Sequence, residues 1–273
     1  DNTMRPMGGW RTRSDNAAAA PIRGMLSWID NSNDRWIVGG TYNKLYVWTP
    51  AGVRHDITPT SFTAGRDDAV AFTGYGGSFY GSYAYGIERP DTVRIQPATS
   101  WALDTWGQNL VGCTEDDGKI YEWSLATGTP AAVLSNAPTS NRSLVVTEER
   151  FLFALGAGGN PRKVQWSDRE DNNLWTPAAT NEAGDLELNT SGQIMAGIKV
   201  RGQTLILTST DAHVANYIGP PYVYGIERVG SSCGLAANKA VSVVDAGAFW
   251  MGAHAFYAYT GGAVQEIQRE VAE

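Results

Sequence analysis

The chain has 273 residues, including 31 glycines and 12 prolines, with 11% aromatic residues, only 18% charged residues and a formal net charge of −7. This composition excludes a disordered chain, which would be poor in aromatic residues, and a helical bundle, which glycine and proline would break. It also lacks the basic stripe of a protein that grips DNA phosphates and any run of about 18 apolar residues that would predict a membrane span.

The start of the chain leaves its processing open, and its two cysteines do not predict a disulfide scaffold. The sequence opens Asp1-Asn2-Thr3, without an initiator Met or a cleavable leader, which indicates either a processed start or part of a longer product. Cys113 and Cys233 are too few for a disulfide scaffold and are predicted to be free thiols.

A repeat runs along the chain: an apolar residue, an aromatic, a variable residue, a second aromatic and then a hydroxyl residue. The closing aromatics lie at 48, 123, 166, 217 and 259, with gaps of 75, 43, 51 and 42 residues. A Tyr-rich stretch ending near Tyr85 divides the long first gap, so six units would average about 42 residues. The five clearest copies are Leu45-Tyr46-Val47-Trp48-Thr49, Ile120-Tyr121-Glu122-Trp123-Ser124, Val164-Gln165-Trp166-Ser167, Val214-Ala215-Asn216-Tyr217 and Phe256-Tyr257-Ala258-Tyr259-Thr260.

Each copy follows a second apolar run that ends in a turn, and the two runs together predict a β-hairpin. In chain order these preceding runs are residues 36–40, 110–112, 151–156, 204–208 and 249–252. A hairpin cannot bury both of its faces alone, so the units must stack. Repeats of 40–50 residues are typical of propeller blades, whereas a β-sandwich would place turns every 8–12 residues without this recurrence.

We therefore predict an all-β fold, a β-propeller of about six blades of antiparallel strands. No linker or charge run divides residues 1–273, so the sequence predicts a single domain.

One segment resembles the turn that carries the nucleophile of a hydrolase. Gly230-Ser231-Ser232-Cys233-Gly234 fits the pattern G-x-S-x-G, and Asp245 and His254 follow in the order of that family's triad. Such a turn requires a helix after the serine, but here a second strand, residues 241–244, is predicted. We expect an inter-blade turn and no enzymatic activity, and hence no catalytic residues.

Metal and cofactor sites are not predicted either. His55, His213 and His254 are widely separated, and the polar run 30–34 lacks the central Gly and distal Glu of a calcium loop. That run and Asp116-Asp117-Gly118 are predicted to be turns. We expect no metal and no cofactor.

Phosphate-binding loops are also missing from the sequence. The Gly- and Tyr-rich stretch 74–86 contains no G-x-G-x-x-G, and Gly118-Lys119 is followed by Ile120 instead of Ser or Thr. Tyr80, Tyr83 and Tyr85 would pack between blades or present aromatic faces to a sugar or a protein.

The pentapeptide Tyr85-Gly86-Ile87-Glu88-Arg89 recurs as Tyr224-Gly225-Ile226-Glu227-Arg228. Its offset of 139 residues is a little over three average units. Equivalent inter-blade corners, with Glu and Arg paired across a turn, would explain the recurrence, and so would coincidence.

Several segments resemble the propeller-type tail accessory or nozzle proteins of short-tailed, P22-like phages. They span most of the chain: residues 35–48, Trp101-Ala102-Leu103-Asp104-Thr105-Trp106-Gly107, Trp166-Ser167-Asp168, Leu174-Trp175-Thr176-Pro177, Ala183-Gly184-Asp185-Leu186, Tyr217-Ile218-Gly219-Pro220-Pro221 and Cys233-Gly234-Leu235. The resemblance implies a virion structural protein, made in the host cytoplasm and present as six copies around the tail axis. It would extend the DNA channel, help to retain and release the packaged genome, and contact the adaptor or portal and the tail needle or fibres. It transfers no site residues.

An acidic subunit suits such a conduit, because carboxylates let double-stranded DNA slide without sequence-specific binding. A ring of this kind would need flat, moderately apolar flanks. The alternative is a carbohydrate-binding propeller for host attachment, in which the aromatics at 48, 123, 166, 217 and 259 would line repeated sugar pockets.

Overall fold

The computed structural model describes residues 14, 16–69 and 96–267, and nearly all regular structure in these ranges is β-strand. Twenty strands form five four-stranded antiparallel sheets, and a three-residue 3-10 turn, Ala157–Gly159, is the one helical element in the described ranges. Each sheet is built from four strands that follow one another in the sequence. The strands are β1 (Gly24–Ile29), β2 (Arg35–Gly40), β3 (Leu45–Trp48), β4 (Arg54–Asp56), β5 (Trp101–Trp106), β6 (Asn109–Thr114), β7 (Ile120–Trp123), β8 (Ala132–Val133), β9 (Ser143–Val146), β10 (Leu152–Leu155), β11 (Lys163–Trp166), β12 (Gly184–Glu187), β13 (Ile194–Val200), β14 (Gln203–Thr208), β15 (Asp211–Gly219), β16 (Val223–Ser231), β17 (Val241–Val244), β18 (Gly247–Met251), β19 (Phe256–Tyr259) and β20 (Val264–Ile267).

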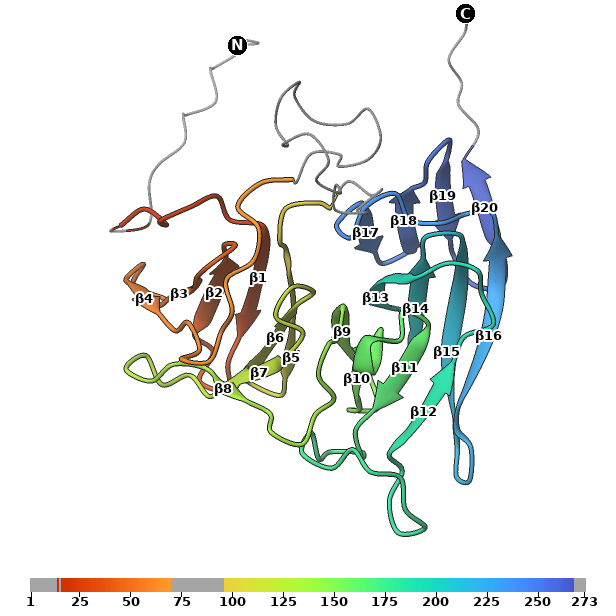
Figure 1. Ribbon diagram of the computed structural model, residues 1–273, viewed down its shortest axis with the longest axis horizontal. Coiled ribbons are helices and arrows are strands. Elements are labelled where there is room, and N and C mark those ends of the chain that lie inside the picture. The colour runs from red at the N-terminus through yellow and green to blue at the C-terminus, as the bar shows by residue number, and fades with distance from the viewer. Residues whose placement is uncertain (1–13, 15, 70–95, 268–273) are drawn as a thin grey trace, which may run out of the picture.

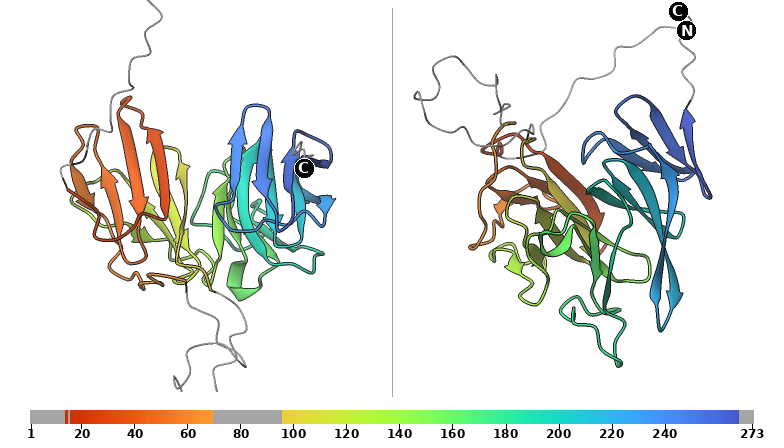
Figure 2. Two further views of the ribbon diagram at one scale, coloured as in Figure 1. Left: turned by 90° about the horizontal axis from the view of Figure 1, so that it is seen from above. Right: turned by 45° about the vertical axis from the view of Figure 1, so that its right-hand side comes forward.

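The five sheets are the blades of a β-propeller, here called blades 1 to 5 in chain order. The first strands of successive blades, β1, β5, β9, β13 and β17, contact one another along the centre of the molecule. The second, third and fourth strands of each blade lie progressively further out (Figure 1). Figure 2 shows the same blades standing side by side from two other directions. The prediction of an all-β propeller is confirmed.

The described residues contain five blades where the sequence predicted about six. The predicted extra unit, ending near Tyr85 and including Tyr80 and Tyr83, falls within residues 70–95, which lie outside the described residues. Blade 1 packs directly against blade 2, because Gly24 of β1 and Gly40 of β2 both touch Trp101 of β5. The long gap between the first two clear repeat copies therefore does not separate blades 1 and 2 in space.

The repeat that the sequence revealed is the central hairpin of each blade. Its closing aromatics lie on the third strands β3, β7, β11, β15 and β19, and the preceding apolar runs are the second strands β2, β6, β10, β14 and β18. The antiparallel registers pair these two strands in every blade. In blades 1 to 4 both strands are largely buried against neighbouring blades, whereas β18 and β19 of blade 5 are buried on one side and expose Phe249, Met251 and Phe256 on the other.

The hydrophobic core is divided into four clusters, and each cluster fills one junction between consecutive blades. One cluster lies between blades 1 and 2, one between blades 2 and 3, one between blades 3 and 4, and one between blades 4 and 5. A closed ring of five blades would contain a fifth cluster between blades 5 and 1, and none is found within the described ranges. Within the described part of the chain, one flank of blade 1 and one flank of blade 5 therefore belong to no core cluster.

No helix within the described ranges has the length and apolarity needed to cross a membrane.

Candidate functional site

The hairpin turn between β14 and β15 begins a polar cluster at the junction of blades 4 and 5. Thr208 closes this turn, since its Oγ1 accepts the backbone N–H groups of Thr210 at 3.1 Å and Asp211 at 2.9 Å. Thr41 closes the corresponding turn of blade 1 in the same way, accepting the N–H of Lys44 at 3.0 Å. The repeat therefore determines the local backbone, and the residue that follows the turn determines the chemistry: Lys44 in blade 1 and Asp211 in blade 4.

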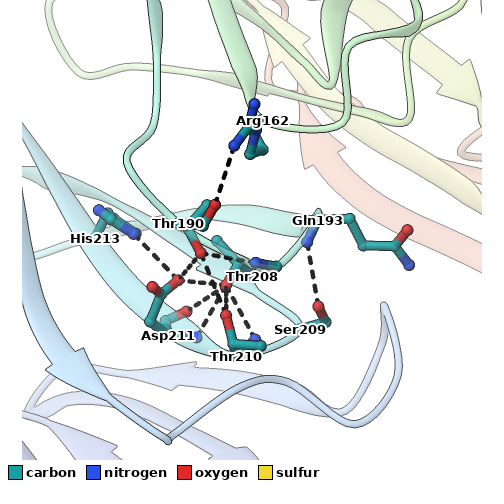
Figure 3. A network of polar contacts seen from close by, with 9 residues as sticks. Arg162, Thr190, Gln193, Thr208, Ser209, Thr210, Asp211 and His213 are labelled. Atoms are coloured by element: carbon teal, nitrogen blue, oxygen red, sulfur yellow. Dashed lines mark hydrogen bonds and ion pairs between the residues drawn. The ribbon is translucent and has the colours of Figure 1, made fainter.

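Asp211 is a buried carboxylate held in one orientation (Figure 3). Its Oδ1 accepts hydrogen bonds from Thr190 Oγ1 at 2.8 Å and from Thr208 Oγ1, and it lies 3.1 Å from His213 Nε2. All three partners are themselves buried. Within the described part of the chain, every hydrogen bond to this carboxylate is accepted by Oδ1. The second oxygen, Oδ2, is therefore available to a ligand.

The connection from blade 4 to blade 5 crosses this turn at very short range. The N–H of Cys233 donates to the carbonyl of Thr210 at 3.1 Å. Gly234 lies so close that a Cβ atom there would stand 2.1 Å from the carbonyl oxygen of Ser209. Only glycine fits at this crossing, which brings the end of β16 beside the turn.

A pocket of about 430 Å³ lies where these segments meet the β18–β19 turn. Most of its side chains carry hydroxyl groups or charges, and they come from four separate segments of blades 4 and 5. The lining consists of Ser191, Ser209, Thr210, Asp211, Arg228, Ser231, Ser232, Gly234, Ala253, His254 and Tyr257.

The hydrolase-like segment reaches this pocket, but not as a nucleophile elbow. Ser232 and His254 both line the pocket, whereas Asp245 lies in the turn between β17 and β18. Ser232 has a left-handed backbone, with φ of 56°, but the described chain continues into β17 with no helix after it. Burial, together with the nearby Asp211, raises the pKa of Cys233 to about 11, so this thiol is not an activated nucleophile. The predicted inter-blade turn is confirmed.

Arginines occur near three other blade junctions, and each is paired with a carboxylate. Arg66 pairs with Asp116 between blades 1 and 2, and Arg142 pairs with Glu115 between blades 2 and 3. Arg162 pairs with Glu187 in blade 3 and also donates to the carbonyl of Thr190 at 3.4 Å. Arg228 differs from them: among the described residues it has no ion pair and no hydrogen-bond partner, and its side chain is exposed.

A second, smaller pocket of about 240 Å³ lies at the junction of blades 2 and 3. Glu115, Asp116 and Asp117 line it, and Arg142 is its only arginine. Each of these carboxylates has a basic partner: Glu115 pairs with Arg142, Asp116 with Arg66 and Asp117 with Lys119. Asp116-Asp117-Gly118 forms the turn between β6 and β7, as predicted.

The other motifs are structural where the structure describes them. Asp30 caps the β1–β2 turn, accepting the N–H groups of Ser32 at 2.8 Å and Asp34 at 2.9 Å, so the predicted turn is confirmed. Within the described ranges no three His, Cys, Asp or Glu side chains are placed to hold a metal ion. His55 lies on β4 in blade 1, whereas His254 lines the pocket between blades 4 and 5.

The prediction that the repeated pentapeptide marks an inter-blade corner is wrong for the copy that is described. Residues 224–228 lie in the middle of the outer strand β16, and Tyr224 packs between blades 3 and 4. Its ring stands 4.8 Å from that of Phe153, and its hydroxyl lies 2.9 Å from Thr147 Oγ1. The copy at residues 85–89 lies outside the described residues.

Four of the five repeat aromatics are packing residues, contrary to the idea that they line sugar pockets. Trp123, Trp166 and Tyr259 are buried in junction clusters, and the half-buried Tyr217 packs against the cluster between blades 3 and 4. These side chains fill the space between blades, whereas Trp48 is half-buried on the outer flank of blade 1. Sequence recurrence alone could not distinguish the two roles.

No protein-family model matches the sequence, and the search of curated proteins finds no match. Among solved structures the chain is similar to a streptogramin B lyase, with 11% identity, a TM-score of 0.44, and coverage of 93% of this chain and 86% of that one. It is also similar to virginiamycin B lyase from Staphylococcus aureus, with 9% identity, a TM-score of 0.44, and coverage of 96% and 88%. A third is YCF48 bound to D1 peptide, with 13% identity, a TM-score of 0.41, and coverage of 96% and 87%. At these identities and TM-scores none of them informs on what this protein binds or catalyses.

Proposed function

We propose that the protein is a structural subunit that assembles side to side into a ring. The observation that carries the proposal is the pair of apolar flanks at the two ends of the blade series. Four core clusters cover the four junctions between described blades, and among the described residues no such cluster covers the outer flanks of blades 1 and 5. Only part of the blade 1 flank is lined by the segment that leads into β1, where Trp48 Nε1 donates to Ser14 Oγ and Ile22 lies beside Gly39.

The flank of blade 5 carries a row of apolar side chains across three strands. The register aligns Met251 of β18 with Phe256 of β19 and Ile267 of β20. Phe249 lies two residues from Met251 on the same face, and Met251 is 44% exposed. The row borders a shallow groove of about 250 Å³. Contiguous exposed apolar surface of this kind is typical of interaction sites.

The flank of blade 1 is also apolar and lies at the other end of the series. Met25 and Ile29 alternate on the outer face of β1 and are 67% and 52% exposed. Ile37 and Trp48 face each other across β2 and β3 and are half-buried. A second copy that places its blade 5 against this flank would continue the blade stacking found at each junction within the chain.

Such a contact joins two different surfaces, so it repeats from copy to copy and forms a ring where the rotation between copies closes. Six copies in a ring would match the resemblance to phage tail nozzle proteins. In that setting the ring would extend the DNA channel, contact the adaptor and the tail needle or fibres, and use its net charge of −7 to let the genome slide.

Native mass over a concentration series tests the assembly, with a species near six times the 29.4 kDa chain mass as the expected result. Met251→Glu should dissociate that species, because the contact would bury an unpaired charge. Val133→Glu, at another exposed apolar position on β8, should leave it intact. A wild-type chain that stays monomeric throughout would contradict the proposal. A Met251→Glu chain that is merely less stable as a monomer would show that another segment of the same chain covers the flank.

The conduit role has a separate test. The assembled ring should not retain double-stranded DNA at low ionic strength, where phosphate contacts are strongest. Tight binding that weakens steeply with added salt would refute a sliding conduit and leave the ring itself unaffected.

A further inference from the structure

We propose that the pocket between blades 4 and 5 binds an acidic sugar, with the carboxylate on Arg228 and the sugar hydroxyls on Asp211 and the surrounding serines and threonine. This site is distinct from the flanks that would form the ring. The proposal stands on the charge, the hydrogen-bonding groups and the size of the pocket.

Arg228 brings an unpaired charge to the pocket. Arg66, Arg142 and Arg162, near the other three junctions, are each neutralised by a carboxylate of this chain, whereas Arg228 has no such partner among the described residues. A guanidinium with a free donor fork at a pocket mouth is well suited to a carboxylate, which it binds through two parallel hydrogen bonds. The ligand should therefore carry a carboxylate.

Asp211 lines the pocket together with Arg228. Asp211 is held by three contacts at Oδ1. Its side chain is therefore already oriented before a ligand arrives, and binding loses little side-chain entropy there. Its Oδ2 can accept hydrogen bonds but cannot donate them. A ligand that meets this oxygen must bring donors, and the hydroxyl groups of a sugar are such donors.

Most of the remaining lining consists of hydroxyl groups, which can both donate and accept hydrogen bonds. They belong to Ser191, Ser209, Thr210, Ser231 and Ser232. Tyr257 is fixed by a hydrogen bond of 3.0 Å from its hydroxyl to the Ser232 carbonyl and provides an aromatic face. A volume of about 430 Å³ falls within the range of small-ligand pockets. Its polar lining favours a hydroxylated ligand over an apolar one.

Other ligand classes satisfy only part of the pocket. The Asp211 carboxylate would repel a multiply charged phosphate, and the Arg228 guanidinium would repel a cation. A neutral sugar would leave Arg228 without a partner. A monocarboxylic sugar, such as a uronic acid, uses both charged groups.

The experiment is a titration of the intact protein with glucuronate, followed by calorimetry or ligand-observed NMR, beside matched titrations with glucose and inorganic phosphate. We expect glucuronate to bind at millimolar concentration or below and to be preferred over both of the others. Arg228→Gln should weaken glucuronate binding about tenfold or more and abolish the preference for glucuronate over glucose. Arg35→Gln, another exposed arginine on β2, is the matched control and should bind like the wild type.

Asp211→Asn keeps an acceptor for its buried partners and should weaken glucose and glucuronate alike, provided that its unfolding curve matches the wild type. No glucuronate binding would overturn the proposal, as would equal binding by Arg228→Gln or a preference for phosphate. Because Arg228 is exposed and has no ion pair or side-chain hydrogen bond among the described residues, its substitution tests the site even where Asp211→Asn unfolds the chain.

Discussion

Substituting Gly40 by alanine should destabilise the junction between blades 1 and 2. A Cβ at this position would lie 2.1 Å from Cδ1 and 2.4 Å from Cγ of Trp101. The Trp101 ring cannot move aside easily, because it is fully buried, stacks on Phe62 at 5.1 Å and donates from Nε1 to the Thr41 carbonyl at 2.8 Å. Restoring ordinary contact distances would require the ring or the strand to shift by more than an ångström.

The magnitude follows from two opposing effects. Overpacking a core typically costs about 1–3 kcal/mol, and a rigid ring at this distance places the cost near the upper end. Replacing glycine in a strand by alanine returns about 0.5–1 kcal/mol of backbone entropy. We therefore expect Gly40→Ala to lower the free energy of unfolding by about 2 kcal/mol.

Urea unfolding followed by tryptophan fluorescence measures this change, with Gly128→Ala as the control, because nothing lies within 4 Å of a Cβ at Gly128. The control should unfold within about 0.5 kcal/mol of the wild type. Combining Gly40→Ala with Trp101→Phe should cost less than the sum of the two single changes, since the smaller ring relieves the clash. The packing argument would be refuted by a Gly40→Ala chain as stable as the control, or by strict additivity in the double variant.

Two further predictions concern titratable groups. Burial raises the pKa of the Asp117 carboxyl, but hydrogen bonds from Tyr121, Lys119 and Thr63 outweigh burial and hold it below the ordinary value. The carboxylate therefore stabilises the fold above the unfolded-state pKa of about 3.9 and loses this effect as the pH falls through the folded-state pKa. Asp117→Asn should be less stable than the wild type at pH 7, with a difference that shrinks below about pH 4 in denaturant titrations; a pH-independent difference would contradict this. Burial also raises the pKa of both Cys113 and Cys233, so a thiol reagent should label both only after unfolding, and prompt labelling of the native protein would show that one is accessible.

The repeat was readable because the middle strands of each blade carry apolar side chains, which are buried on both sides in blades 2 to 4 and on one side in blades 1 and 5. Residues 45–49 and 120–124 share an apolar and aromatic pattern since they occupy the same place in different blades, and the preceding apolar runs are their hairpin partners. Blade number was harder to predict, because it depended on counting gaps of unequal length. The gap of 75 residues between Trp48 and Trp123 suggested an extra blade, yet blades 1 and 2 are in direct contact.

The pocket was only partly predictable. The sequence singled out residues 230–234 and His254, but for a triad with Asp245 that the fold does not assemble. Asp211 carried no sequence signal, because a lone carboxylate beside a turn is unremarkable until its partners are known. Arg228 belonged to the repeated pentapeptide, which predicted pairing with a Glu and not a place in this pocket.

The sequence by itself determined the local units: strands of alternating pattern, turns closed by threonine and glycine, and a period that requires stacking. These follow from short-range sterics and from the burial of apolar faces, which adjacent residues already encode. The tertiary structure alone decided which surfaces remain uncovered and which polar groups meet. Those outcomes depend on the connection that crosses from the outer strand of one blade to the inner strand of the next, which brings residues 191, 211, 228 and 257 to one pocket and leaves the flanks of blades 1 and 5 exposed.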